Sequence, residues 1–210
     1  MYVPKHFEEA DIAALYALMR AYPLATLVTL DAEGLTANHI PFFLDANAPP
    51  SGRLQAHVAR ANPVWKSFSS EVETLAIFQG PDAYISPSWY ATKQETGKVV
   101  PTWNYSVVHA YGTLRVVDDP AWVRTNVENL TVRQEAGFAE PWSVSDAPRD
   151  YTEKLIGAIV GIELTITRLV GKRKTSQNQP PANREGVVRG LEGLETDAAQ
   201  AMAALIPKSD

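Results

Sequence analysis

The hydrophobic residues near the start of the chain recur with helical spacing. Ile12, Leu15, Tyr16 and Met19 lie three or four positions apart, or directly adjacent, and acidic residues precede them. A 3.6-residue period places such positions on one helix face, and the helix dipole favours acidic residues at the N-terminal end. The pattern therefore predicts an amphipathic first helix.

From residue 25 onward, runs rich in β-branched and aromatic residues alternate with turn residues. Residues 25–30 and 35–44 flank a Gly-containing turn and predict a hairpin, in which Pro41 indicates an edge, a bulge or a break. Further strands are predicted at RLQAHVA, TLAIFQG, AYIS, SVVHAYGTLRVV and GIELTITRLV. Turns separate most of these runs, which favours an antiparallel β-barrel or sandwich with peripheral helices.

Helix starts are marked where a capping residue precedes a proline, as at Asn62-Pro63 and Asp119-Pro120. These starts predict a short helix through Phe68 and a longer one that ends before Gly137. Other helices are expected at residues 151–159, 187–194 and 197–205, with a basic loop, GKRKTSQNQPPANREG, before the last two. We expect one domain over residues 1–180 and a helical extension over 181–210 that packs on it.

Composition is that of an ordinary globular protein. Of 210 residues, 45% are hydrophobic and 20% charged, and there is no cysteine, which favours a reducing cytoplasm. The N-terminus lacks the order of a signal peptide, and the uncharged apolar stretch at residues 155–162 is too short to span a bilayer. We therefore expect a cytoplasmic protein without a membrane span.

Common catalytic and nucleotide-binding motifs are absent from the sequence. His6, His39, His57 and His109 show no metal-binding spacing, and no G-x-S-x-G, Walker or G-x-G-x-x-G motif occurs. A net charge of −5 opposes non-specific binding to nucleic acid. We predict no metal site and assign no catalytic residue. Because neither common phosphate-binding motif occurs, other donors must hold any bound phosphate.

Ring-bearing side chains gather in residues 78–112, where turn residues and a polar bridge interrupt them. We interpret this segment as two aromatic-rich turns joined by a mobile loop, suited to a subunit interface or a planar ligand. Core packing is the alternative for any single ring. The residues assigned to this region are Trp89, Tyr90, Trp103, Asn104, Tyr105 and His109.

Two further stretches combine cations with hydrogen-bond donors. The basic loop bunches Lys172, Arg173 and Lys174 with polar side chains, and HVARANP joins His57 and Arg60 to a capped helix start that favours an anion. A solvated loop and a routine helix cap are the alternatives.

Five motifs together resemble the PaiB-type family of negative transcriptional regulators. MYVPKHF, HVARANP, FQGPDAYISPSWY, VPTWNYSVVHAYG and KRKTSQN stand in the family's order, over residues 1 to about 193. The resemblance implies an FMN-binding split β-barrel, usually a homodimer with flavin at the subunit interface. It also implies a bacterial cytoplasmic protein that represses sporulation and protease genes.

The resemblance also implies which regions approach the flavin: the second strand, the third strand with its turn, and the family's KLSQN motif, here with Thr175 in place of the apolar residue. The implied FMN-binding residues are Asn38, His39, Ile40, His57, Val58, Ala59, Arg60, Asn62, Lys174, Ser176, Gln177 and Asn178. We expect His57 and Lys174 to face one anionic group, the flavin phosphate.

Three functions stay open at this point. The first is a PaiB-like regulator that binds FMN without being an enzyme. The second is an FMN-dependent oxidoreductase, in which the flavin carries the redox chemistry. The third is a haem protein with His39, His57 or His109 as axial ligand. A homodimer is expected in each case, and Lys172, Arg173 and Lys174 could contact either DNA or the flavin phosphate.

Overall fold

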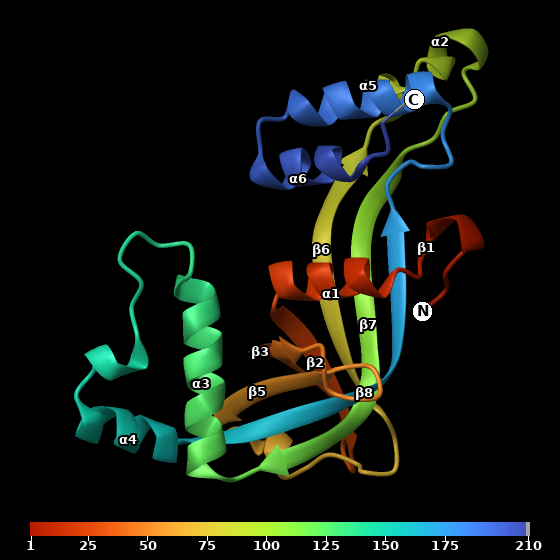
Figure 1. Ribbon diagram of the computed structural model, residues 1–210. Coiled ribbons are helices and arrows are strands. Elements are labelled where there is room, and N and C mark those ends of the chain that lie inside the picture. Colours follow the sequence, from red (N-terminus) through yellow and green to blue (C-terminus); the bar gives the residue numbers. More distant parts are fainter. Residues whose placement is uncertain (209–210) are drawn as a thin grey trace. The chain divides into compact units, whose positions relative to one another are not determined.

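The computed structural model describes residues 1–208, and its strands form one mainly antiparallel sheet (Figure 1). The strand order is β3-β2-β6-β7-β8-β5-β4, with β1 paired to β8. The strands are β1 Glu8–Glu9, β2 Leu24–Asp31, β3 Gly34–Pro41, β4 Phe43–Asp45, β5 Arg53–Ala59, β6 Thr74–Ile85, β7 Thr102–Val117 and β8 Ile159–Lys174.

The helices lie between and after these strands. They are α1 Ile12–Ala21, α2 Thr92–Thr96, α3 Pro120–Glu135, α4 Arg149–Gly157, α5 Pro181–Glu192 and α6 Asp197–Leu205, with 3-10 turns η1 Lys5–Phe7, η2 Pro63–Trp65, η3 Pro87–Trp89 and η4 Val144–Asp146. Both predicted caps are confirmed: Asn62 accepts from the Val64 amide, and Asp119 accepts from the Ala121 amide. Within residues 1–208, no helix is both long enough and apolar enough to cross a membrane.

The described chain divides into two compact units. Unit 1 comprises Met1–Leu18, Gln79–Val108 and the described residues from Val170 onward, and unit 2 comprises Met19–Phe78 and His109–Leu169. The longest strands, β6, β7 and β8, contribute residues to both. Each unit has its own buried residues and is described separately below.

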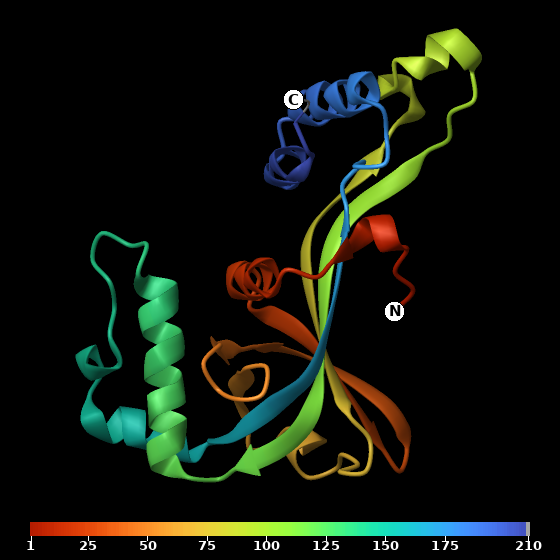
Figure 2. The same cartoon turned by 45° about the vertical axis from the view of Figure 1, so that its right-hand side comes forward.

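Unit 2 is built on the β2–β3 hairpin and the β4–β5–β8 ladder. The hairpin pairs Leu24 with Pro41 and Asp31 with Gly34, whose φ of +123° is strained for residues with a side chain. Helix α3 contacts β5, and α3 and α4 are joined by a long connection (Figure 2). Strand β8 approaches α3 at Gly161, where a Cβ atom would lie 2.4 Å from the Trp122 ring.

Unit 1 contains the packed pair of helices α5 and α6. Their apolar residues bury Ile85 and Tyr90 in a cluster that also contains Val187, Leu191 and Met202. Helix α5 lies so close to η3 that a Cβ atom at Gly190 would be 2.2 Å from the Trp89 ring. The two glycines of α5 on this side, Gly186 and Gly190, therefore allow the helix to dock on Trp89.

Several predicted boundaries are wrong, for identifiable reasons. The two short strands expected around Pro81 are one strand, β6. The pairing of β6 with β2 ends at Ile77, so Pro81 lies outside that ladder. Its missing N–H therefore costs no hydrogen bond with β2, and the strand continues through it. The polar bridge, predicted as a loop, instead contains α2, which ends at Thr96 and is capped by Gly97 with a φ of +65°. Sheet pairing likewise begins β7 at Thr102 and extends β8 to Lys174.

The helix predictions also need correction. The helix after Asn62 is a single 3-10 turn that ends at Trp65, and α5 begins at Pro181 rather than residue 187. The basic loop is correspondingly shorter. Helix α6 matches its predicted bounds, and α3 and α4 begin and end within two residues of theirs.

Candidate functional site

Two predicted flavin residues from different elements of unit 2 form a direct contact. The Asn62 side chain donates from Nδ2 to Asn38 Oδ1 at 2.9 Å, while its own Oδ1 accepts from the Val64 amide at 2.9 Å. Ile40 is buried and His39 is exposed, as strand alternation predicts. The bridge links the turn after β5 to β3 through neutral amide groups.

His57 lies beside a residue that the sequence did not single out. Its Nδ1 is 3.1 Å from Oδ1 of Asn126 on α3, so the imidazole donates from Nδ1. Asn126 is 2% exposed, and its Nδ2 is a buried donor without a partner. A sequence pattern could have identified Asn126, because it is the polar residue on the buried face of α3 that includes Val123 and Leu130. Val58, next to His57, is buried, and Ala59 is exposed.

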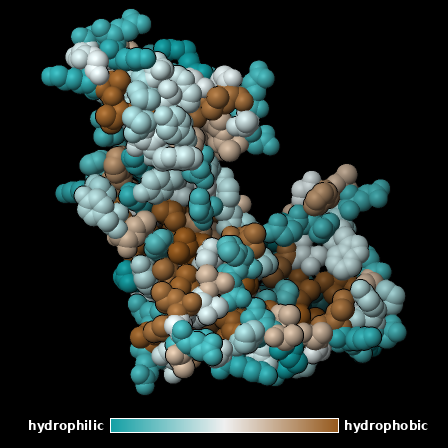
Figure 3. Space-filling model, turned by 180° about the vertical axis from the view of Figure 1, so that it is seen from behind, coloured by the Kyte–Doolittle hydropathy of each residue, from teal (hydrophilic) through white to brown (hydrophobic). Residues whose placement is uncertain are grey.

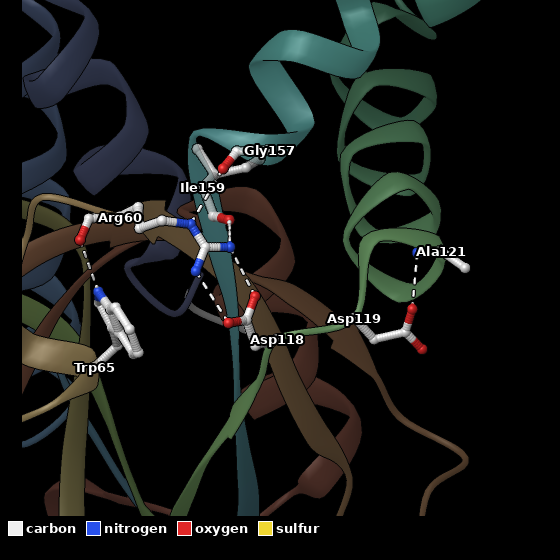
Figure 4. A network of polar contacts seen from close by, with 7 residues as sticks. All are labelled: Arg60, Trp65, Asp118, Asp119, Ala121, Gly157 and Ile159. Atoms are coloured by element: carbon white, nitrogen blue, oxygen red, sulfur yellow. Dashed lines mark hydrogen bonds and ion pairs between the residues drawn. The ribbon is translucent and has the colours of Figure 1, made fainter.

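Arg60 is held in a network of polar contacts in unit 2 (Figure 4). Its guanidinium donates to both carboxylate oxygens of Asp118, at 2.9 and 2.7 Å, and to the Gly157 and Ile159 carbonyls. The bond to Asp118 raises the Arg60 pKa and lowers that of Asp118. An incoming phosphate would therefore compete with Asp118 for this cation.

The KTSQN residues of unit 1 lie around the end of β8. Lys174 donates to the Thr102 hydroxyl, and Asn104 donates from Nδ2 to Ser176 Oγ at 2.9 Å. The Gln177 side chain turns back, accepting from the Thr175 amide and donating to the Arg173 carbonyl. Gln177 is thus occupied in shaping the loop. Thr175, the departure from the family motif, is buried.

Lys174, Ser176 and Asn178 line one pocket of about 310 Å³, with Thr102 and Asn104. Burial is the main cause that lowers the Lys174 pKa, and the nearby Lys172 charge lowers it further. Three of the four unit 1 residues predicted for flavin are therefore gathered at one pocket. His57 belongs to unit 2 and Lys174 to unit 1, so the expectation that both face one anion stays a prediction.

The aromatic residues of segment 78–112 divide into packed and exposed ones. Trp89 and Tyr90 pack in the α5–α6 cluster, so for them core packing accounts for the ring. Trp103 is 54% exposed and meets Tyr84 edge to face at 6.0 Å. On the face shown in Figure 3, hydrophobic residues are also exposed in several patches. The homodimer expected to cover such surface stays a prediction.

The remaining members of that segment contact polar groups. Lys172 Nζ lies 5.0 Å from the centre of the Tyr105 ring, and it donates to the Tyr2 carbonyl. His109 Nδ1 is 3.5 Å from the Tyr111 hydroxyl, and burial lowers the His109 pKa. The third cation of the basic stretch, Arg173, donates to the Leu205 carbonyl and pairs with Glu9.

Comparison with known proteins identifies the family. The model of the family described as "Putative FMN-binding domain" matches residues 1–168. An uncharacterised protein of the fungus Emericella nidulans is 36% identical, over 98% of this chain and 96% of its own. The "Protease synthase and sporulation protein PAI 2" of Bacillus subtilis is 28% identical, over 98% of this chain and 96% of its own.

Solved structures show the same fold at low sequence identity. The flavocytochrome Anf3 from Azotobacter vinelandii matches with a TM-score of 0.58 at 15% identity, over 83% of this chain and 73% of its own. The split-barrel fold predicted from the sequence is therefore confirmed. Because fungi also hold close relatives, the expected bacterial origin stays a prediction. The chain belongs to the FMN-binding family that its resemblance to PaiB-type proteins indicated, and this membership supports a flavin, with FMN as its form, as the cofactor.

Proposed function

We propose that this protein binds FMN and acts as a PaiB-like negative transcriptional regulator, with the flavin as its sensing group. Family membership over residues 1–168 supports the cofactor, and the similarity to the Bacillus subtilis sporulation protein over almost the whole chain supports the role. The observation that carries the proposal is the His57–Asn126 pair, which leaves a buried amide donor free next to a predicted flavin residue.

The side chains of unit 2 fit a flavin chemically. A buried donor without a partner costs about 1–3 kcal/mol, so it favours a ligand that brings an acceptor. The flavin ring offers carbonyl oxygens and ring nitrogens as acceptors. Asn126 Nδ2 would meet such an acceptor, and His57 would be held in orientation by Asn126 Oδ1. The Asn38–Asn62 bridge would fix the turn after β5 against β3. When bound, the flavin would supply one- or two-electron redox chemistry.

Regulation through a flavin does not require the basic stretch to contact DNA. Lys172, Arg173 and Lys174 each have a partner inside unit 1: a carbonyl oxygen for the first two and the Thr102 hydroxyl for the third. In this proposal the redox or occupancy state of FMN changes the protein's interactions with its partners, and the chain itself contributes binding and orientation.

A spectrum and a titration test the proposal. The purified protein should bind FMN at one per chain and show flavin absorption bands, and Asn126→Leu should weaken FMN roughly tenfold, because one hydrogen bond is lost. His6→Ala, at an exposed histidine without a predicted flavin role, is the control and should bind FMN like the parent.

Three results would contradict the proposal. A Soret band without flavin bands would identify a haem protein, and absence of FMN binding would remove the sensing group. Rapid, repeated oxidation of NADH by the FMN-loaded protein would identify the oxidoreductase instead.

A further inference from the structure

The pocket at the end of β8 has an unusual charge for this chain. Its wall is built from η1, the segment before β7, β7 itself, the loop after β8 and α5, all within unit 1. The lining includes two lysines, Lys98 and Lys174, and no aspartate or glutamate. In a protein with a net charge of −5, such a lining favours an anionic ligand.

Lys174 is the cation best placed for that role. Among the described residues it forms no ion pair with a carboxylate, and it donates a hydrogen bond to a neutral hydroxyl, that of Thr102. Burial lowers its pKa, which means that the charged form is under-stabilised in the free protein. An anion beside Nζ would restore that stabilisation.

Asn104 provides a second, independent observation. It is fully buried on β7, it donates from Nδ2 to Ser176 Oγ, and its Oδ1 has no partner among the described residues. Ser176 is held with a φ of +60°, which few non-glycine residues adopt. The pocket wall therefore offers an acceptor that a ligand hydroxyl can satisfy, close to the cation that an anion can satisfy.

We propose that this pocket binds a phosphomonoester that carries a neighbouring hydroxyl group. The phosphate would accept from Lys174 Nζ and the Thr102 hydroxyl, and the ligand hydroxyl would donate to Asn104 Oδ1. Phe7, Val99 and Val100 supply an apolar wall for the carbon chain. At about 310 Å³ the pocket is at the small end of ligand sites, which suits a five-carbon polyol phosphate.

A free sugar phosphate presents this chemistry. It would bind within unit 1 whether or not unit 2 holds flavin, so the inference goes beyond the proposed function.

Calorimetric titrations of the FMN-saturated full chain with ribose 5-phosphate, and of the flavin-free chain with FMN, test the inference. Lys174→Met should weaken ribose 5-phosphate by roughly 10- to 100-fold, as expected for loss of a charge-assisted hydrogen bond. Lys172→Met makes the same charge change two residues away, outside the pocket lining, and is the matched control. Lys174→Arg should retain most of the affinity.

Binding of ribose 5-phosphate to the FMN-saturated parent, weakened in Lys174→Met, is the expected result. If Lys174→Met binds ribose 5-phosphate as the parent does, or if the parent does not bind it, the inference is wrong. Loss of FMN affinity in Lys174→Met without binding of ribose 5-phosphate would overturn the inference and assign Lys174 to the flavin phosphate that the resemblance implied. FMN binding that depends on Asn126 but not on Lys174 would leave the proposed function standing whatever the result with ribose 5-phosphate.

Discussion

Arg60 in unit 2 and Lys174 in unit 1 were both predicted from the sequence to bind an anion, but their hydrogen-bond partners in the structure differ. Arg60 donates to two oxygens of Asp118 and to two backbone carbonyls. Lys174 donates to one neutral hydroxyl in a pocket without a carboxylate. A local motif can thus supply a cation, but its tertiary partners decide whether that cation is free for a ligand.

The pKa shifts record the same difference. Asp118 raises the pKa of Arg60, whereas burial lowers that of Lys174. A cation that gains a carboxylate partner is stabilised in its charged form, and one that is buried without such a partner is not. Lys174, which has no carboxylate partner among the described residues, is therefore the better marker of a ligand site than the ion-paired Arg60.

The largest loss of stability is expected on removing the buried carboxylate that pairs with two arginines in unit 2. Glu163 is 1% exposed and accepts from Arg115 at 2.6 Å and Gln55 at 3.2 Å, with Arg53 at 3.3 Å. Glu163→Gln removes the charge that both arginines share. The substitution should lower the free energy of unfolding by about 3 kcal/mol. This is the lower end of the range for breaking a buried ion pair, because both arginines are partly exposed to solvent. Urea unfolding measures this free energy.

The control is the same substitution in an exposed pair. Glu153 pairs with Arg149 one helical turn away, and both side chains are at least half exposed. Glu153→Gln should leave the unfolding midpoint unchanged. Equal losses in the two variants would mean that the buried pairing in unit 2 is not what stabilises it.

A smaller effect is expected in unit 1, where close packing replaces ion pairing. A Cβ atom at Gly190 would lie 2.2 Å from the Trp89 ring, so Gly190→Ala should force α5 away from η3 and cost about 2 kcal/mol. Because Asn183 of α5 also lines the Lys174 pocket, phosphomonoester binding should weaken in the same variant.

Gly193→Ala is the matched control for this helix. Its Cβ atom would have no neighbour nearer than 3.4 Å, and its φ of −70° suits alanine. A circular-dichroism melt should therefore place Gly193→Ala near the parent and Gly190→Ala well below it. Similar melting temperatures would show that α5 can shift on Trp89 without cost.

The periodic parts of the fold were predictable from the sequence. The hairpin of β2 and β3, the alternation along β8 and the capped start of α3 follow from local spacing and capping residues. The continuity of β6 through Pro81 was not, because it depends on where the pairing with β2 stops. The same holds for Gly190, whose role depends on Trp89, about a hundred positions earlier in the sequence.

The candidate site was predictable by region but not by contact. Lys174, Ser176 and Asn178, which one motif contains, line one pocket, and Asn38 contacts Asn62, while their binding of flavin stays a prediction. Nothing local indicated that Asp118 would occupy Arg60. Which donors are satisfied is decided by long-range contacts, and no local pattern encodes them.

The smallest effect should come from freeing Arg60. Asp118 is exposed, and its bond to Arg60 lowers its pKa below the ordinary value of an aspartate. The pair therefore contributes stability above that ordinary pKa and loses it as the carboxylate takes up a proton on further acidification. Asp118→Asn should therefore lower the thermal midpoint slightly at pH 7, and the difference should vanish in acid and shrink in high salt. A difference that is the same at every pH and salt concentration would mean that the asparagine disturbs packing rather than charge. If the comparison between the two cations is right, Asp118→Asn should also leave Arg60 without a carboxylate partner there, as Lys174 is. Titration with inorganic phosphate should then show weak binding to the variant that the parent lacks.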